Sequence, residues 1–346
     1  MDNSILNQEI HQQPKIIAEL IESENANVSQ IVRSIRGQFK YVVIAARGTS
    51  DNAARYAQYL FGGHNQLQVA LATPSLFSLY ETPPNLSEAL VIGISQSGQS
   101  PDIVAVLAEA SRQGRPSLAI TNQVDSPLAR AAEYKILLHA GYEKAVAATK
   151  TYTSSLAALA MLSCHLQDNP ARLEQLRQMP AVMRATLENL QDVIGRTERY
   201  RYMEQCSVIG RGFNYSTAFE IALKVKELTR VVAEPYSSAD FRHGPIATVT
   251  QGFPLILVAP VGAVSKDMAD LFVHLQSLQA ELITISDDPN LLASSRLALA
   301  IPAGLPEWLT PLVAVIPGQL FALKLALARG LNPDQPVGLQ KVTETF

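Results

Sequence analysis

The sequence predicts an α/β fold built from two tandem copies of one unit, each with a mainly parallel sheet flanked by helices. Short β-branched runs alternate with longer helical patterns, which is typical of parallel sheets covered by helices on both faces. The strand segments and the loops that follow them recur later in the chain at a nearly constant offset. With 346 residues, of which 47% are hydrophobic, the chain is long enough for two domains.

The first copy is expected over residues 38–168, after an N-terminal helical segment over residues 1–37. Helical segments separate most of its expected strands, and a long apolar helix over 151–166 ends the copy. The runs expected to form buried parallel strands are YVVIAA (41–46), LQVALA (67–72), ALVIGIS (89–95), SLAITN (117–122) and KILLHA (135–140).

The second copy is expected over residues 200–330, after a helical connector over 169–199. VIAARGTSDN around Gly48 aligns with VIGRGFNYST around Gly212, and the strand ends at Ser95 and Asn122 align with those at Pro260 and Asp287. A C-terminal tail over 331–346 is expected to close over the active site. Its apolar residues Val337, Leu339 and Val342 are spaced as if to pack down.

Hydroxyl and amide side chains end one strand of the first copy, in the stretch SQSGQSP (95–101). Ser100 followed by Pro101 predicts a helix N-cap and first helical position, so the loop should place its hydroxyls beside exposed helix amides. Those amides can hold a phosphate without a cation, and Gly98 permits close backbone approach. The second copy has APVGA at this place, so a phosphate loop is expected in the first copy only.

Composition excludes several classes of partner. The net charge is −3 and no basic run occurs, which speaks against nucleic acid or an anionic membrane surface. The N-terminus lacks a signal pattern, and no uninterrupted apolar run is long enough to span a bilayer, so a cytoplasmic location is expected. The two cysteines, Cys164 and Cys206, have no metal-site or disulfide spacing and are expected to be inert core thiols.

The ordered motifs GTS, SQSGQSPD, AGYEKAVAATKTYTSSLAAL, ALKVKELTRVVAEPYSSADFRHGP and GLQKVTETF resemble the double sugar isomerase (SIS) domain family. The resemblance runs from about residue 40 onward. It is greatest to the isomerase half of glutamine:fructose-6-phosphate aminotransferase and to stand-alone relatives that deaminate glucosamine 6-phosphate. It implies a homodimer that acts on a small sugar phosphate, with no metal and no organic cofactor.

The resemblance also implies roles for individual residues. Glu227 matches the carboxylate that moves a proton between C1 and C2, and Lys224 lies one turn before it. His243 matches the histidine linked to ring opening and presented to the neighbouring subunit, and Lys341 matches the lysine that reaches the sugar carbonyl as a cation or as a Schiff base. The positions that match phosphate- and sugar-binding residues are Thr49, Ser50, Ser95, Gln96, Ser97, Ser100 and Val146.

Two positions depart from the aminotransferase pattern: Arg47 replaces a cysteine, and Ala148 replaces a serine near the sugar. The second change leaves the identity of the sugar open. Glu143 and Lys144 are expected to fix their loop by pairing, with a site role as the alternative. Lys150, at a helix start, should lie near a buried partner or an anion.

The sequence begins MDNSIL and reaches its first sugar-loop motif within fifty residues, so no glutaminase activity is expected. The function expected is conversion of glucosamine 6-phosphate and water to fructose 6-phosphate and ammonia. Alternatives on the same scaffold are a deglycase for phosphorylated fructose-amines and a plain aldose-ketose isomerase. A sensor that binds a sugar phosphate without turnover is a further alternative, although it would not require an acid, a base and a lysine together.

Overall fold

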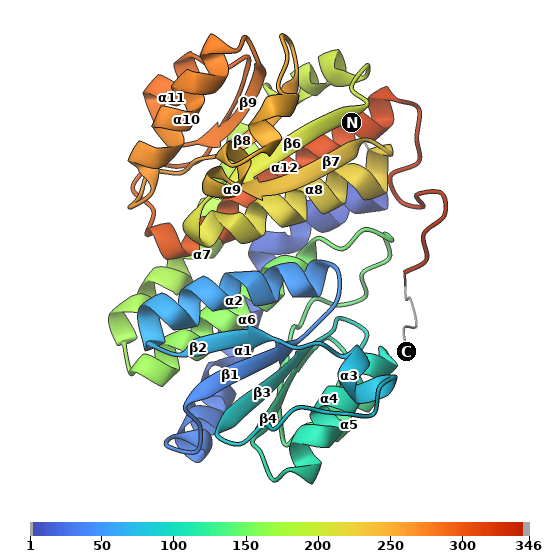
Figure 1. Ribbon diagram of the computed structural model, residues 1–346, viewed down its shortest axis with the longest axis vertical. Helices are drawn as coiled ribbons and strands as arrows, with labels where there is room; N and C mark the ends of the chain where they lie inside the picture. The colour runs from blue at the N-terminus through green and yellow to red at the C-terminus, as the bar shows by residue number, and fades with distance from the viewer. Residues whose placement is uncertain (1–2, 342–346) are drawn as a thin grey trace. The chain divides into compact units, whose positions relative to one another are not determined.

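The computed structural model describes residues 3–341 and contains two five-stranded parallel sheets (Figure 1). The described chain forms two compact units. The first unit comprises residues 15–143 and 150–178 together with Gln340 and Lys341, and the second comprises residues 3–14, 144–149 and 179–339. Residues 342–346, including Val342 of the expected tail, lie outside the described part of the chain.

The sheet of the first unit has the strand order β2-β1-β3-β4-β5, and every neighbouring pair is parallel. The central strands β1, β3 and β4 are buried runs of apolar residues because helices cover both faces of the sheet, whereas the edge strands β2 and β5, also expected to be buried, are largely intermediate or exposed. β3, for example, is buried at all of its positions. The strands are β1 (Tyr41–Ala45), β2 (Gln68–Leu71), β3 (Ala89–Ile94), β4 (Ser117–Thr121) and β5 (Tyr134–Leu137).

Helices α2 and α6 pack against each other in this unit, and α4 packs against α3 and α5. One hydrophobic cluster joins the buried side of α4, including Ile103, Val106 and Leu107, to strand residues such as Val43 and Val91. The helices are α2 (Thr49–Asn65), α3 (Ser75–Ser78), α4 (Pro101–Arg112), α5 (Pro127–Ala131) and α6 (Lys150–Gln167). Helices α1 (Ile5–Ile35) and α7 (Pro170–Asn189) each contribute residues to both units.

The sheet of the second unit has the order β7-β6-β8-β9-β10, which repeats the order of the first with all pairs parallel. Its strands are β6 (Gln205–Gly210), β7 (Val232–Ser237), β8 (Pro254–Val258), β9 (Glu281–Ser286) and β10 (Leu297–Ala300). The α-helices are α8 (Tyr215–Thr229), α9 (Ser238–Arg242), α10 (Ser265–Ser277), α11 (Pro289–Ala293) and α12 (Thr310–Ala328). The 3-10 helices of this unit are η1 (Ile194–Tyr200), η2 (Gly212–Asn214), η3 (Pro245–Thr248) and η4 (Glu307–Leu309). The predicted fold of two repeated α/β units is therefore confirmed.

Helix α12 is the most apolar helix of the second unit and packs against α8 (Figure 1). The segment Glu307–Ala328 is long and apolar enough to cross a membrane by length and composition, contrary to the expectation that no such run exists. However, 83% of its most apolar window is buried inside the protein. That burial is the property of a core helix in an α/β unit.

The C-terminal tail does not pack through its apolar side chains as expected. Val337 is 78% exposed and Leu339 is 42% exposed. The tail is instead fixed by polar contacts, because the Asp334 carboxylate accepts hydrogen bonds from the backbone amides of Ile5 and Leu6 at 3.0 and 2.8 Å. The expectation of apolar packing at Val337 and Leu339 was wrong because the short apolar spacing occurs in exposed chain with no facing core.

Candidate functional site

Two strand-to-helix loops lie at one edge of the first sheet, because β1 and β3 are adjacent parallel strands whose carboxyl ends meet there. In the order β2-β1-β3-β4-β5, the chain adds β2 on one side of β1 and then adds β3, β4 and β5 on the other side, so the order of strand addition reverses between β1 and β3. Ligands of open α/β sheets collect at such a reversal point. The structure thus brings together the loop over 46–49 and the loop over 95–100, as the sequence predicted.

The loop after β3 presents hydroxyl groups and backbone amides together. Ser95 is buried and its Oγ accepts the Gly98 amide at 3.1 Å, while Ser97 Oγ accepts the Gln99 amide at 3.3 Å. Gly98 has φ +61°, and an added Cβ would lie 2.2 Å from Ser126 Oγ, so only glycine fits. Ser97 is partly exposed, so its hydroxyl is accessible to a ligand.

Ser100 is the N-cap of α4 and Pro101 follows at the first helical position, as predicted. Its hydroxyl makes no capping hydrogen bond to the helix, so it does not occupy the amides of the first turn. Gln96 is partly exposed in the same loop. Pro101 has no amide hydrogen and the Ile103 amide donates to Asp102 Oδ1 at 2.9 Å, so the hydroxyls of the loop are its main candidate donors for a phosphate.

The loop after β1 begins α2 at Thr49, with Gly48 at the N-cap at a positive φ of 54°. Thr49 and Ser50 form the first turn and are partly buried. Arg47, where the aminotransferase pattern has cysteine, pairs with Asp102 of α4 at 2.9 Å. The Asp102 side chain is only 1% exposed, so this ion pair ties the two loops together.

The corresponding loop of the second unit is occupied by the chain's own carboxylates. Asp287 Oδ1 accepts the Val261 amide at 2.7 Å, and Glu307 Oε2 accepts the Ala263 amide at 2.8 Å. Ser265 Oγ accepts the Gly262 amide at 2.7 Å. These carboxylates would repel a phosphate, which supports a phosphate loop in the first unit alone.

Ser97→Ala should raise the KM for a sugar phosphate by about 10- to 100-fold, because a hydrogen bond to a charged group contributes about 1.5 to 3 kcal/mol. The fold should stay intact, since Ser97 Oγ accepts only a long local bond from Gln99. Ser265→Ala is the matched control, because its hydroxyl bonds only within its own turn to Gly262. Steady-state kinetics and thermal unfolding of both variants check this, and equal KM changes would refute the assignment of the loop.

Lys341 and Glu143 form an ion pair within the first unit. Lys341 Nζ lies 2.7 Å from Glu143 Oε2, and the Glu143 side chain is fully buried. Lys150 is buried at the start of α6 and donates from Nζ to the Tyr142 carbonyl oxygen at 3.1 Å. The sequence flagged each of these charged residues separately but did not predict that Glu143 and Lys341 meet.

Helix α8 of the second unit carries a row of three charged side chains. Lys224 is 1% exposed and its Nζ lies 2.5 Å from Glu227 Oε2 and 3.4 Å from Glu220 Oε1. Glu220 is fully buried, whereas Glu227 is 22% exposed. Glu220 was missed from the sequence, although its i,i+4 spacing from Lys224 is the pattern of a helical ion pair. Of the two carboxylates, Glu227 is therefore the accessible one.

His243 caps the C-terminus of α9 and is exposed. Its backbone amide donates to the Asp240 carbonyl oxygen at 3.1 Å. Val146 also belongs to the second unit, where its amide donates to the Asp334 carbonyl oxygen at 3.2 Å. The predicted site residues are thus divided between the two units, with the two loops and Lys341 in the first and Glu227, Lys224, His243 and Val146 in the second.

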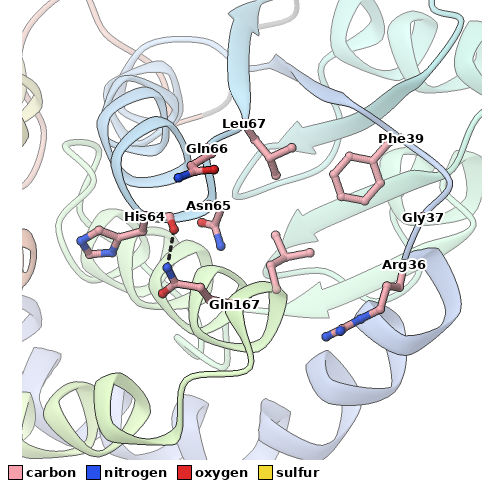
Figure 2. Close-up of a pocket in the computed structure, with 9 residues that line it drawn as sticks. Arg36, Gly37, Phe39, His64, Asn65, Gln66, Leu67 and Gln167 are labelled. Atoms are coloured by element: carbon pink, nitrogen blue, oxygen red, sulfur yellow. Dashed lines mark hydrogen bonds between the residues drawn. The ribbon is translucent and has the colours of Figure 1, made fainter.

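A cavity of about 380 Å³ lies elsewhere in the first unit (Figure 2). Its lining residues Phe39 and Leu67 precede β1 and β2, so the cavity is at the opposite edge of the sheet from the two loops. Burial, with a smaller contribution from the charge of Arg172, lowers the pKa of His64 to about 4. His64 is therefore neutral at physiological pH, and none of the predicted site residues lines this cavity.

Both cysteines are buried, and no group of three or more metal-binding side chains occurs within residues 3–341. Burial raises the pKa of both thiols, Cys164 and Cys206, to about 12. A thiol with such a pKa is not a nucleophile at neutral pH.

Comparison with known proteins is consistent with the repeated architecture. The SIS domain model matches residues 38–164 and 203–329. A glutamine–fructose-6-phosphate aminotransferase (isomerizing) of Thermococcus kodakarensis is 33% identical over 343 residues, covering 96% of this chain and 56% of that protein. The chain therefore spans about half the length of the curated relatives it matches.

Solved structures have the same fold. A protein of Silicibacter pomeroyi DSS-3, provisionally described as a phosphosugar isomerase, superposes with a TM-score of 0.86 at 29% identity, covering 96% of this chain and all of the other. Glucosamine-6-phosphate deaminase of Thermotoga maritima superposes with a TM-score of 0.78 at 20% identity, covering 99% and 100% of the two chains. With two matches that together cover most of its length, the chain belongs to the SIS domain family.

Proposed function

We propose that the chain is a cytoplasmic sugar-phosphate isomerase that converts glucosamine 6-phosphate and water to fructose 6-phosphate and ammonia. The observation that carries the proposal is the charged row on α8, where buried Lys224 and Glu220 fix Glu227 as a partly exposed carboxylate. A sensor would not need a carboxylate held in this way. The aminotransferase of Thermococcus kodakarensis bears a name that specifies fructose 6-phosphate, which supports a hexose 6-phosphate as ligand.

The phosphate is proposed to bind at the loop over 95–100, at the start of α4, with the hydroxyls of Ser95, Ser97 and Ser100 as donors. Thr49 and Ser50 are proposed to hold the sugar phosphate from the neighbouring loop, with Gln96 and Val146 as further contacts. The helix N-terminus contributes partial positive charge, so this loop needs no lysine or arginine of its own.

The chemistry requires one acid/base group at the ring oxygen and one carboxylate at C1 and C2. His243 is proposed to open the ring, since an imidazole can donate a proton from one ring nitrogen and accept one at the other. Glu227 then removes the C2 proton of the open aldehyde and returns it to C1, which converts the resulting enamine to a C2 imine. Water adds to the imine carbon, and ammonia leaves to give the ketose phosphate. Lys341 is proposed to act at the carbonyl oxygen.

Ammonia release is the proposed direction of the reaction. Hydrolysis of the C2 imine needs only water as second substrate.

A substrate panel tests the proposal against the deglycase and the plain isomerase. Glucosamine 6-phosphate should release equal amounts of ammonia and fructose 6-phosphate, whereas a fructose-amine phosphate and glucose 6-phosphate should react much more slowly. Ala148, which replaces a serine of the aminotransferase pattern, makes Ala148→Ser the informative variant for sugar preference. Faster turnover of the fructose-amine phosphate would favour the deglycase instead, and binding of every sugar phosphate without turnover would favour the sensor.

We further propose that the protein is a homodimer in which His243 serves the partner's site, as its exposed position at the end of α9 permits. Mixing inactive Glu227→Gln and His243→Ala chains should then restore activity, because half of the randomly paired dimers contain one complete site. The expected recovery is about a quarter of the parent activity for two-fold dimers. No recovery after verified subunit exchange would mean that His243 acts within its own chain.

A further inference from the structure

The ammonium group of Lys341 is held by a carboxylate to which the sequence assigned no firm role. Glu143 Oε2 lies 2.7 Å from Lys341 Nζ, and the Glu143 side chain is fully buried while that of Lys341 is 21% exposed. The two residues are 198 positions apart in the chain but belong to the same compact unit. A buried carboxylate at this distance from an ammonium group is a charge-assisted contact, which is stronger than a neutral hydrogen bond.

Glu143 is itself fixed by the start of helix α6. Its Oε1 accepts the Thr151 backbone amide at 3.2 Å, and its Oε2 accepts Thr151 Oγ1 at 2.8 Å. Amides of the first helical turn lack partners within the helix, and a carboxylate there is favoured by the helix dipole. Thr151 is buried, as is most of α6, so the carboxylate is attached to a rigid part of the first unit.

The apolar side chains of the tail do not supply this anchoring. Val337 and Leu339, which precede Lys341, are 78% and 42% exposed. Gln340 is also exposed. Holding a long lysine side chain at one point costs conformational entropy. The contact with Glu143 offsets that cost.

We propose that Glu143 is the positioning residue for Lys341, and that it acts on the reaction only through that lysine. This proposal rests on the proposed function, because it assumes that Lys341 reaches the sugar carbonyl. Either role of Lys341, as a cation or as an imine-forming amine, requires the amine to remain at one place. Glu143 supplies that placement from the rigid start of α6, and the phosphate loop is independent of it.

The first test needs no substrate. Acylation of Lys341 by an amine-selective succinimidyl ester, followed by peptide mass spectrometry, should be about 10-fold faster in Glu143→Gln than in the parent, as expected for loss of a charge-assisted contact. Glu88→Gln is the matched control, because Glu88 pairs with Lys40 at 2.5 Å on the surface. Its removal should leave Lys341 labelling unchanged. Equal labelling of Lys341 in Glu143→Gln and the parent would overturn the proposal, whether or not the protein deaminates glucosamine 6-phosphate.

The second test uses turnover to separate positioning from a general structural effect. Glu143→Gln should lower kcat for glucosamine 6-phosphate by about 10- to 100-fold while KM changes little, and Glu143→Asp should restore part of the loss. The double variant Glu143→Gln/Lys341→Ala should be no slower than Lys341→Ala alone. If the fold-reduction in kcat of the double variant equalled the product of the reductions in the two single variants, Glu143 would act independently of Lys341. A parent protein that does not turn over glucosamine 6-phosphate would refute the proposed function but leave the labelling result valid.

Discussion

Glu227→Gln should lower the rate of ammonia release from glucosamine 6-phosphate by about 100- to 10,000-fold, the usual effect of removing a general base. Glutamine keeps the shape of the side chain and one oxygen acceptor for Lys224, but it cannot take up the C2 proton. Lys224 retains its contact with Glu220 at 3.4 Å, so the buried charge stays paired and the fold should survive.

Substrate binding should persist in this variant. The proposed phosphate contacts come from Ser95, Ser97 and the start of α4 in the other unit, so the dissociation constant should stay near that of the parent. Exchange of the C2 hydrogen with solvent deuterium, measured by nuclear magnetic resonance, should stop together with ammonia release, since it reports the proton transfer itself.

Glu188→Gln provides the control for this experiment, because Glu188 is an exposed carboxylate on α7 and should leave both rates unchanged. Normal C2 exchange in Glu227→Gln would place the base elsewhere, with Lys224 or Glu143 as the next candidates. A parent protein that shows neither exchange nor ammonia release would instead favour a sensor.

Local sequence pattern was sufficient to predict the repeated fold. Most of the parallel strands are short apolar runs, although β7 (VAEPYS) is not, and the two copies repeat the strands in the same order. The Ser100–Pro101 helix start could also be predicted, because capping depends on residues that are neighbours in the chain. These features are local, so no knowledge of the tertiary structure was needed.

Pairings between distant residues could not be predicted in the same way. Glu143 pairs with Lys341 because the fold brings the start of α6 and the tail together. Neither segment contains a local sequence pattern that indicates the other as its partner. The hydrogen bonds that the Asp287 and Glu307 carboxylates accept from loop amides of the second unit could not be predicted for the same reason. Spacing within one helix was the exception, since the i,i+4 pattern of Glu220 and Lys224 was visible in the sequence and was overlooked.

Lys224→Met should destabilise the protein by about 3–5 kcal/mol, because removing one partner of a buried ion pair leaves the other charge uncompensated. Lys224 is 1% exposed, and the Glu220 carboxylate that it faces is fully buried. Methionine is close to lysine in length, so the loss should come from the charge rather than from a cavity. Urea unfolding followed by circular dichroism measures the change in the free energy of unfolding.

Two further variants separate charge from packing at this position. Lys226→Met changes an exposed lysine on the same helix and should alter the free energy of unfolding by less than about 0.5 kcal/mol. Lys224→Met/Glu220→Gln removes the uncompensated carboxylate as well and should recover a large part of the stability lost in Lys224→Met. A double variant that is as unstable as the sum of its single changes would mean that Lys224 stabilises α8 through packing of its carbon chain. In that case the buried row would not be an electrostatic support for Glu227.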